Sequence, residues 1–213
     1  MHIWCRVVVA TGSYPHPVGH HWAMTTEQTP SQMDADALAL ALGRVLMGHT
    51  TMTLHLRALH KALCASAPAI VLADGKDAGP LLAECERMIR CGPHLFADSS
   101  ADAVLGEARA LNKERNAYAH GTWVRAYDDR PHGKGELIGK WTLTPLGNPN
   151  LQPKHIRTVQ TGHVERVVRR LQRASLGIVW LAFACSSMSQ WQDATTGPLA
   201  DALEGLERWE PAK

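Results

Sequence analysis

The feature that most constrains the fold is a long apolar repeat in the first third of the chain. Between residues 38 and 63, side chains recur at alternating spacings of four and three residues, which is the period of one face of an α-helix. The repeat covers about seven helical turns, so we expect this helix to bury one face against other helices. Its members are Leu38, Leu42, Val45, His49, Met52, Leu56, Leu59 and Leu63.

The residues at both ends of this repeat predict where the helix begins and ends. Thr29 is suited to the N-cap, Pro30 to the first helical position and Gln32 to the third residue of a capping box. Pro68 stops the helix at the other end.

His49 is the one polar member of the repeat. A histidine at a buried position is ordinarily a core residue with its hydrogen bonds satisfied. The alternative is that His49 reaches the polar motif described below, orients it and contributes to substrate binding.

Helical periods and capping residues predict further helices at about 77–90, from 98 or 99 to 120, at about 161–187 and, more weakly, near 198–209. The helix over 161–187 carries a second four-three seam. Its members are Val164, Val168, Leu171, Ser175, Ile178, Ala182 and Cys185.

Residues 122–145 change from a helical period to short alternating stretches separated by a turn-rich loop, which predicts a β-hairpin. We therefore expect a mainly all-α fold, an antiparallel four-helix bundle with a small β-hairpin inserted between its third and fourth helices. Residues 1–28 show no sustained period and predict a flexible N-terminal tail, and 29–213 predict a single domain.

Composition narrows the class of protein. The chain of 213 residues has a formal net charge of +2, so its overall charge does not indicate a nucleic-acid binder, although a local basic site remains open. Its five cysteines form no CxxC pair, which suits a reducing compartment. The longest uncharged apolar stretch, 174–185, is shorter than the roughly 20 residues of a membrane span. These features predict a cytoplasmic protein without a membrane segment.

Polar side chains gather near the end of the predicted third helix. The apolar stripe that ends at Leu111 continues, four residues on, to Arg115. Asn112, Asn116 and His120 follow one another at steps of four on the adjoining stripe. Burying such groups without partners costs several kcal/mol, so they need an explanation. One explanation is structural: Arg115 pairs with a nearby acid or carbonyl, and His120 caps the carboxyl end of the helix.

The other explanation is chemical. The run of residues 115–121, Arg-Asn-Ala-Tyr-Ala-His-Gly, resembles the signature of the HEPN superfamily (higher eukaryotes and prokaryotes nucleotide-binding). That signature is an arginine, usually followed by a polar residue, and a histidine four to six residues further on, near the end of a helix in a helical bundle. The resemblance implies a metal-independent endoribonuclease, often a toxin, defence or RNA-processing module, whose cleft forms between two copies of the chain.

Carried over to this sequence, the resemblance makes Arg115 and His120 the catalytic pair and Asn116 the supporting polar residue. It implies an RNA substrate, a homodimer, no cofactor and no metal, with an antitoxin or other regulatory protein as a further partner. The residue types suit the reaction, because imidazole transfers protons near neutral pH and a guanidinium binds two phosphate oxygens. The alternative is a non-catalytic HEPN-like module for dimerisation or for nucleotide or RNA binding.

Other polar, aromatic and basic residues are candidate substrate contacts. Asn112 lies one turn before Asn116 and is a candidate for substrate binding. Trp123 and Trp141, on the predicted hairpin, either stack on bases or cover an edge of the core. The arginine-rich run at 166–173 is either a solvated face or a track for the RNA backbone.

Overall fold

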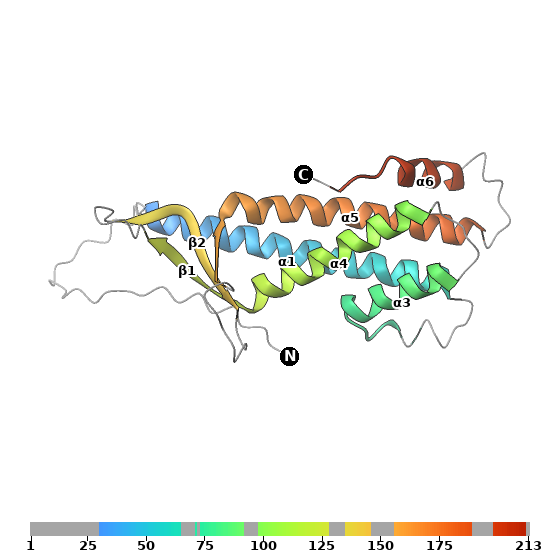
Figure 1. The fold of residues 1–213 in the computed structure, drawn as a ribbon, viewed down its shortest axis with the longest axis horizontal. Coiled ribbons are helices and arrows are strands. Elements are labelled where there is room, and N and C mark those ends of the chain that lie inside the picture. Colours follow the sequence, from blue (N-terminus) through green and yellow to red (C-terminus); the bar gives the residue numbers. More distant parts are fainter. Residues whose placement is uncertain are drawn as a thin grey trace, which may run out of the picture. The chain divides into compact units, whose positions relative to one another are not determined.

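The computed structural model of the chain describes residues 30–64, 71, 73–91, 98–127, 135–145, 156–188 and 198–211. The tail expected over 1–28 lies outside these residues. The described part is mainly helical, as predicted, and includes a three-stranded antiparallel sheet (Figure 1). In chain order the elements are α1 (Pro30–Leu63), α3 (Ala78–Cys91), α4 (Asp98–His120), β1 (Gly121–Tyr127), β2 (Glu136–Pro145), β3 (Arg157–Gln160), α5 (Thr161–Met188) and α6 (Pro198–Glu207).

The chain divides into two compact units, each described by itself below. The sheet unit comprises Met1–Leu42 and Ala117–Val164, and the helical unit comprises Gly43–Asn116 and Glu165–Lys213. Helices α1, α4 and α5 contribute residues to both units. The single domain predicted over 29–213 stays a prediction.

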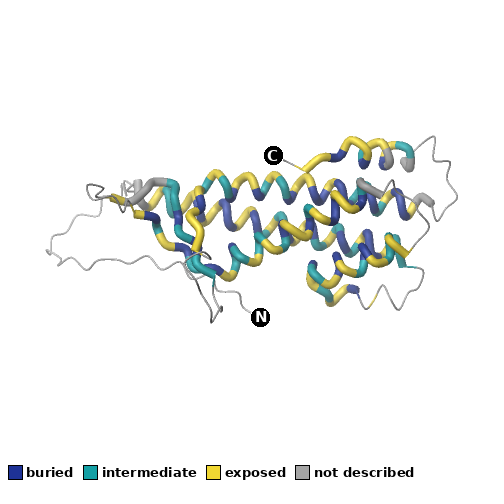
Figure 2. The backbone as a smooth tube through the Cα atoms, viewed as in Figure 1, coloured by how far each residue is buried: buried dark blue, intermediate teal, exposed yellow. Residues whose placement is uncertain are grey.

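The core of the helical unit contains the predicted apolar faces (Figure 2). Val45, Met52, Leu56 and Leu59 of the α1 repeat are each fully buried, and His49 is buried with them. The buried face of α5 is broader than its predicted seam, because residues beside the seam are buried while two seam members, Val168 and Ala182, are half-buried. These extra core residues are Val167, Ala174, Leu181 and Ala184.

The directions of the helices differ from those of a simple antiparallel bundle. Within the helical unit, α4 runs opposite to α1 and α5, whereas α1 and α5 run in the same direction (Figure 1). In an up-down-up-down bundle, the first and last helices would be antiparallel. Helix α3, with 14 residues, is much shorter than α1, α4 and α5, which have 34, 23 and 28 residues.

The sheet unit confirms the predicted hairpin and adds a strand. β1 pairs antiparallel with β2, and the register shifts between Arg125 and Tyr127, where an irregularity interrupts the ladder. β2 also pairs antiparallel with β3, a strand that the sequence analysis did not predict. β3 has only four residues, of which Val159 alone is buried, so it shows too short an alternation to be recognised from sequence.

One described helix has the length and composition of a membrane span. Residues 32–63 of α1 meet that criterion, which the sequence analysis overlooked because it considered only uncharged stretches. A single helix of this kind is weak evidence for a membrane span, because mostly buried core helices and signal sequences have the same length and composition. The most apolar window of this helix is 33% buried.

Candidate functional site

Helix α4 carries the polar motif, and its end is fixed by a glycine. α4 ends at His120, and β1 begins at Gly121. A Cβ atom added to Gly121 would overlap the side chain of Leu143 and lie 2.7 Å from the carbonyl oxygen of Ala117. Only glycine therefore allows the chain to turn directly from helix into strand at this point.

Arg115 is half-buried and only partly paired. Its Nη1 donates a hydrogen bond of 2.9 Å to Oδ1 of Asn116. Its Nε is buried and has no hydrogen-bond partner in the part of the chain that the structure describes. A buried N–H that makes no hydrogen bond costs about 1–3 kcal/mol, so an acceptor that reached this guanidinium would be strongly stabilised. An anion with two oxygens, such as a phosphate, matches the fork geometry of arginine.

His49 lies in the same unit and belongs to the same cluster. Its Nε2 is 2.8 Å from Oδ1 of Asn112, across α1 and α4. An amide oxygen only accepts, so in this arrangement Nε2 carries the proton and Nδ1 carries the lone pair. The imidazole of His49 makes no other hydrogen bond with the side chains or backbone of the described residues.

The pKa of His49 is lowered from its ordinary value. Burial is the main cause, and the positive charge of Arg115 acts in the same direction. The hydrogen bond to Asn112 and the negative charge of Asp77 oppose the shift without reversing it. The imidazole is therefore neutral at pH 7 and able to accept a proton at Nδ1.

The motif histidine has a different environment. His120, the last residue of α4, is exposed and forms no hydrogen bond or ion pair with any described residue. It belongs to the sheet unit, whereas Arg115 belongs to the helical unit. The structure thus brings His49, Asn112 and Arg115 together in one unit and places Asn116 beside Arg115.

The structure corrects the base-stacking option for the two tryptophans. Trp123 is only 1% exposed, packs edge-on against Tyr118 with ring centroids 5.3 Å apart, and donates its Nε1–H to the Tyr118 carbonyl at 3.1 Å. Trp141 is buried as well, with Arg125 5.1 Å from its ring centroid. Neither indole offers a face to a base, so Trp123 is a core residue of the sheet unit and is withdrawn as a substrate contact.

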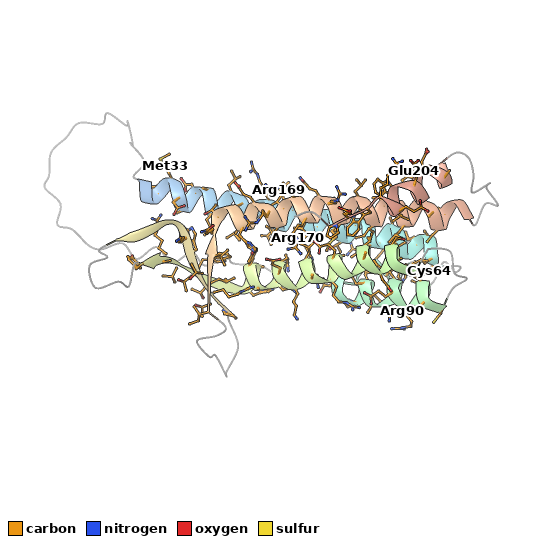
Figure 3. The ribbon with its side chains drawn as sticks, turned by 45° about the horizontal axis from the view of Figure 1, so that its top comes forward. Met33, Cys64, Arg90, Arg169, Arg170 and Glu204 are labelled. Carbon is orange, nitrogen blue, oxygen red and sulfur yellow. The ribbon has the colours of Figure 1, made fainter. Side chains whose placement is uncertain are left out.

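The arginine-rich run on α5 is divided between contacts and solvent. Figure 3 shows Arg170 on the side of α5 that faces α4, and Arg169 on the other side. Arg170 binds Glu107 through Nε at 2.7 Å and Nη2 at 3.1 Å, and binds Glu114 through Nη1 at 3.1 Å. The hydrogen bonds to Glu107 raise the pKa of the guanidinium further, against the effect of burial.

Arg173 donates to the backbone carbonyl of Glu210, which follows α6. The run is therefore no continuous RNA track, because Arg170 and Arg173 hold neighbouring segments in place. Sequence reasoning missed this network. Glu107 and Glu114 lie seven residues apart on α4, a spacing that places them on one face, but it does not reveal their partner.

Among the described residues, no group of three or more histidine, cysteine, aspartate or glutamate side chains is arranged to hold a metal ion. Comparisons with protein-family models, with curated proteins and with solved structures find no match to this chain. Function is therefore argued from the residues and their geometry.

Proposed function

We propose that this protein is a HEPN-like, metal-independent endoribonuclease. The observation that carries the proposal is the half-buried Arg115, whose Nε is sealed without a partner beside Asn116 and a neutral His49. A purely structural arginine would have its N–H groups paired with a carboxylate or a carbonyl. The buried Nε–H of Arg115 instead has no acceptor among the described residues.

The proposed reaction needs only a phosphate-binding cation and proton transfer. The RNA 2′-hydroxyl attacks its own 3′-phosphate, and an imidazole accepts the hydroxyl proton as the new O2′–P bond forms. The P–O5′ bond breaks, and a protonated imidazole supplies the proton that the leaving 5′-oxygen needs. The products are a 2′,3′-cyclic phosphate and a free 5′-hydroxyl. Arg115 stabilises the charge on the phosphorane, and Asn116 orients the guanidinium.

His120 supplies the imidazole in this proposal, and a second copy of the chain supplies the other one. The same proposal includes a HEPN-type helical bundle that forms a homodimer. It also includes a cytoplasmic location without membrane attachment and control by an antitoxin-like or other regulatory partner. The chain's own residues are sufficient for this chemistry, so no cofactor is invoked.

The exposed His120 side chain, which is unpaired among the described residues, favours one alternative function. A general base is normally held in place by a hydrogen bond to a third group, and His120 has none among the described residues. The alternative is a non-catalytic module that binds RNA or a nucleotide phosphate through Arg115.

The deciding experiment compares the purified wild type with His120→Ala on single-stranded and structured RNA in EDTA, with circular dichroism to verify folding. We expect cleavage that leaves 2′,3′-cyclic phosphate ends and that falls by about 10²–10⁴-fold in the variant. Lys113→Ala is the matched control, because Lys113 is an exposed cation on the same helix. RNA binding that requires Arg115, without cleavage by the folded wild type, would establish the binding module instead.

A further inference from the structure

A groove between α1 and α5 of the helical unit is separate from the motif on α4. It has a volume of about 560 Å³, within the roughly 300–1,000 Å³ range of small-molecule sites. Arg44, Gly48 and His55 line it from α1, and Val168, Ser175 and Leu176 line it from α5. The stretch of α1 from residue 44 to residue 55 is about 16 Å long, so the groove is elongated.

Gly48 belongs to the groove lining and lies where α1 and α5 approach each other. A Cβ atom added to Gly48 would lie 3.4 Å from both Cβ and Cδ1 of Leu171, which is ordinary contact distance. Apolar side chains remain uncovered at the rim: Met47 is 73% exposed and Leu176 46% exposed.

Two polar atoms in the groove lining lack hydrogen-bond partners. Ser175 is 5% exposed, and its Oγ is buried and unpaired. Nδ1 of His55, on the opposite wall, is buried and unpaired as well. The threonines of α1 behave differently: Thr51, also in the groove lining, donates to the Met47 carbonyl at 3.2 Å, the usual bond four residues back. Ser175 does not make that bond, so its buried hydroxyl has no hydrogen-bond partner among the described residues.

The charged side chain that lines the groove is a cation, Arg44. Arg44 lies at one end, is exposed and forms no ion pair with any described residue. No acidic side chain is among the residues that line the groove. A guanidinium beside an apolar surface suits a carboxylate or sulfonate attached to an apolar body.

We propose that this groove binds a small amphipathic anion. The anionic group pairs with Arg44, the apolar body lies over Gly48 between Met47 and Leu176, and a hydroxyl at the far end of the ligand bonds to Ser175 or His55. The site is independent of the proposed ribonuclease activity: His49 reaches Asn112 of α4, whereas its neighbour Gly48 faces Leu171 of α5.

The test measures binding of 8-anilinonaphthalene-1-sulfonate by fluorescence and its displacement by dodecanoate and by ω-hydroxydodecanoate. We expect one saturable site for each full-length chain, with the hydroxylated chain binding more tightly. Arg44→Gln removes the charge-assisted hydrogen bond and raises Kd about tenfold or more. Leu176→Glu introduces a repelling charge at the rim and raises Kd similarly. Ser175→Ala, alone or with His55→Ala, abolishes the preference for the hydroxylated chain.

Two substitutions outside the groove serve as controls. Arg87→Gln removes an exposed arginine of α3, and Phe183→Glu changes an exposed apolar residue two turns beyond Leu176 on α5. Both should leave Kd unchanged. Absence of saturable binding, or equal loss in groove and control variants, would overturn the proposal. Light scattering that shows a dimer dissociated by Leu176→Glu but not by Phe183→Glu would also overturn it, because a second copy would then occupy the groove.

Discussion

The lowered pKa of His49 links the stability of the helical unit to pH. A histidine in the unfolded chain takes up a proton below about pH 6.5, whereas His49 in the folded chain resists protonation because it is buried and near Arg115. The unfolded state therefore gains protons first, and the free energy of unfolding falls as the pH decreases below about 6.5.

This effect is isolated by His49→Gln, because glutamine keeps an N–H donor for Asn112 and does not titrate. Between about pH 7.5 and pH 5.5 we expect the wild type to lose up to about 1 kcal/mol more unfolding free energy than the variant, measured by urea denaturation. Equal losses in the two proteins would show that His49 titrates as an ordinary solvent-exposed histidine.

Substitution of Arg115 should affect RNA binding or cleavage much more than it affects the free energy of unfolding. Arg115→Met removes one hydrogen bond to Asn116 and one buried unpaired N–H, two effects that oppose each other. We expect the free energy of unfolding to change by less than about 1 kcal/mol, while RNA binding or cleavage falls at least tenfold. Arg115→Lys keeps the charge but loses the fork, and should restore little activity. A loss of several kcal/mol in urea denaturation would indicate a structural arginine.

At the scale of elements, Gly121 makes the junction between α4 and β1 possible. Gly121→Ala forces a Cβ against Leu143 and the Ala117 carbonyl, so we expect a destabilisation of about 1–3 kcal/mol by thermal or urea unfolding. Gly106→Ala, within α4, is the matched control. Its added Cβ meets nothing within 4 Å, and alanine there should stabilise α4 by about 0.5–1 kcal/mol. Equal effects of the two substitutions would contradict the close contact at Gly121.

The sequence predicted elements better than it predicted their partners. The predicted starts and ends of α3, α4 and α5 are close to those observed, because capping residues and glycine act locally. Helix α1 ends at Leu63, before the predicted stop at Pro68, which lies outside the described residues, as does the predicted N-cap Thr29. β3 escaped prediction because four residues acquire a strand geometry only by pairing with β2. The α1 repeat shows that His49 is a polar residue at a core position. Its partner Asn112 could not be predicted, because the two residues are 63 positions apart in sequence and meet only through the register of α1 and α4.

The groove and the Arg170 network arise in the same way from helix registers. Gly48 and Ser175 cannot be recognised as groove residues from the sequence, because glycine and serine occur in many helices. They line one groove only because α1 and α5 pack side by side in parallel. Local rules thus specified the helices, whereas the sites between them depend on packing over long sequence separations.

At the scale of the whole molecule, the proposed ribonuclease requires two chains, since cleavage needs a base and an acid and one motif supplies one exposed imidazole. This requirement predicts that inactive chains poison active ones. Wild-type chains that have exchanged subunits with an equal amount of His120→Ala chains should lose about half of their cleavage, because half of the wild-type chains then lie in mixed dimers that have a single motif imidazole.

The measurement is the rate of 2′,3′-cyclic phosphate formation before and after exchange, with exchange monitored by fluorescence transfer between labelled chains. Lys113→Ala chains mixed in the same way are the control, because the mixed dimer then keeps both motif imidazoles. Demonstrated exchange without loss of cleavage would mean that each motif acts within its own chain, and His49, the neutral imidazole beside Arg115, would then be the remaining candidate for the second imidazole.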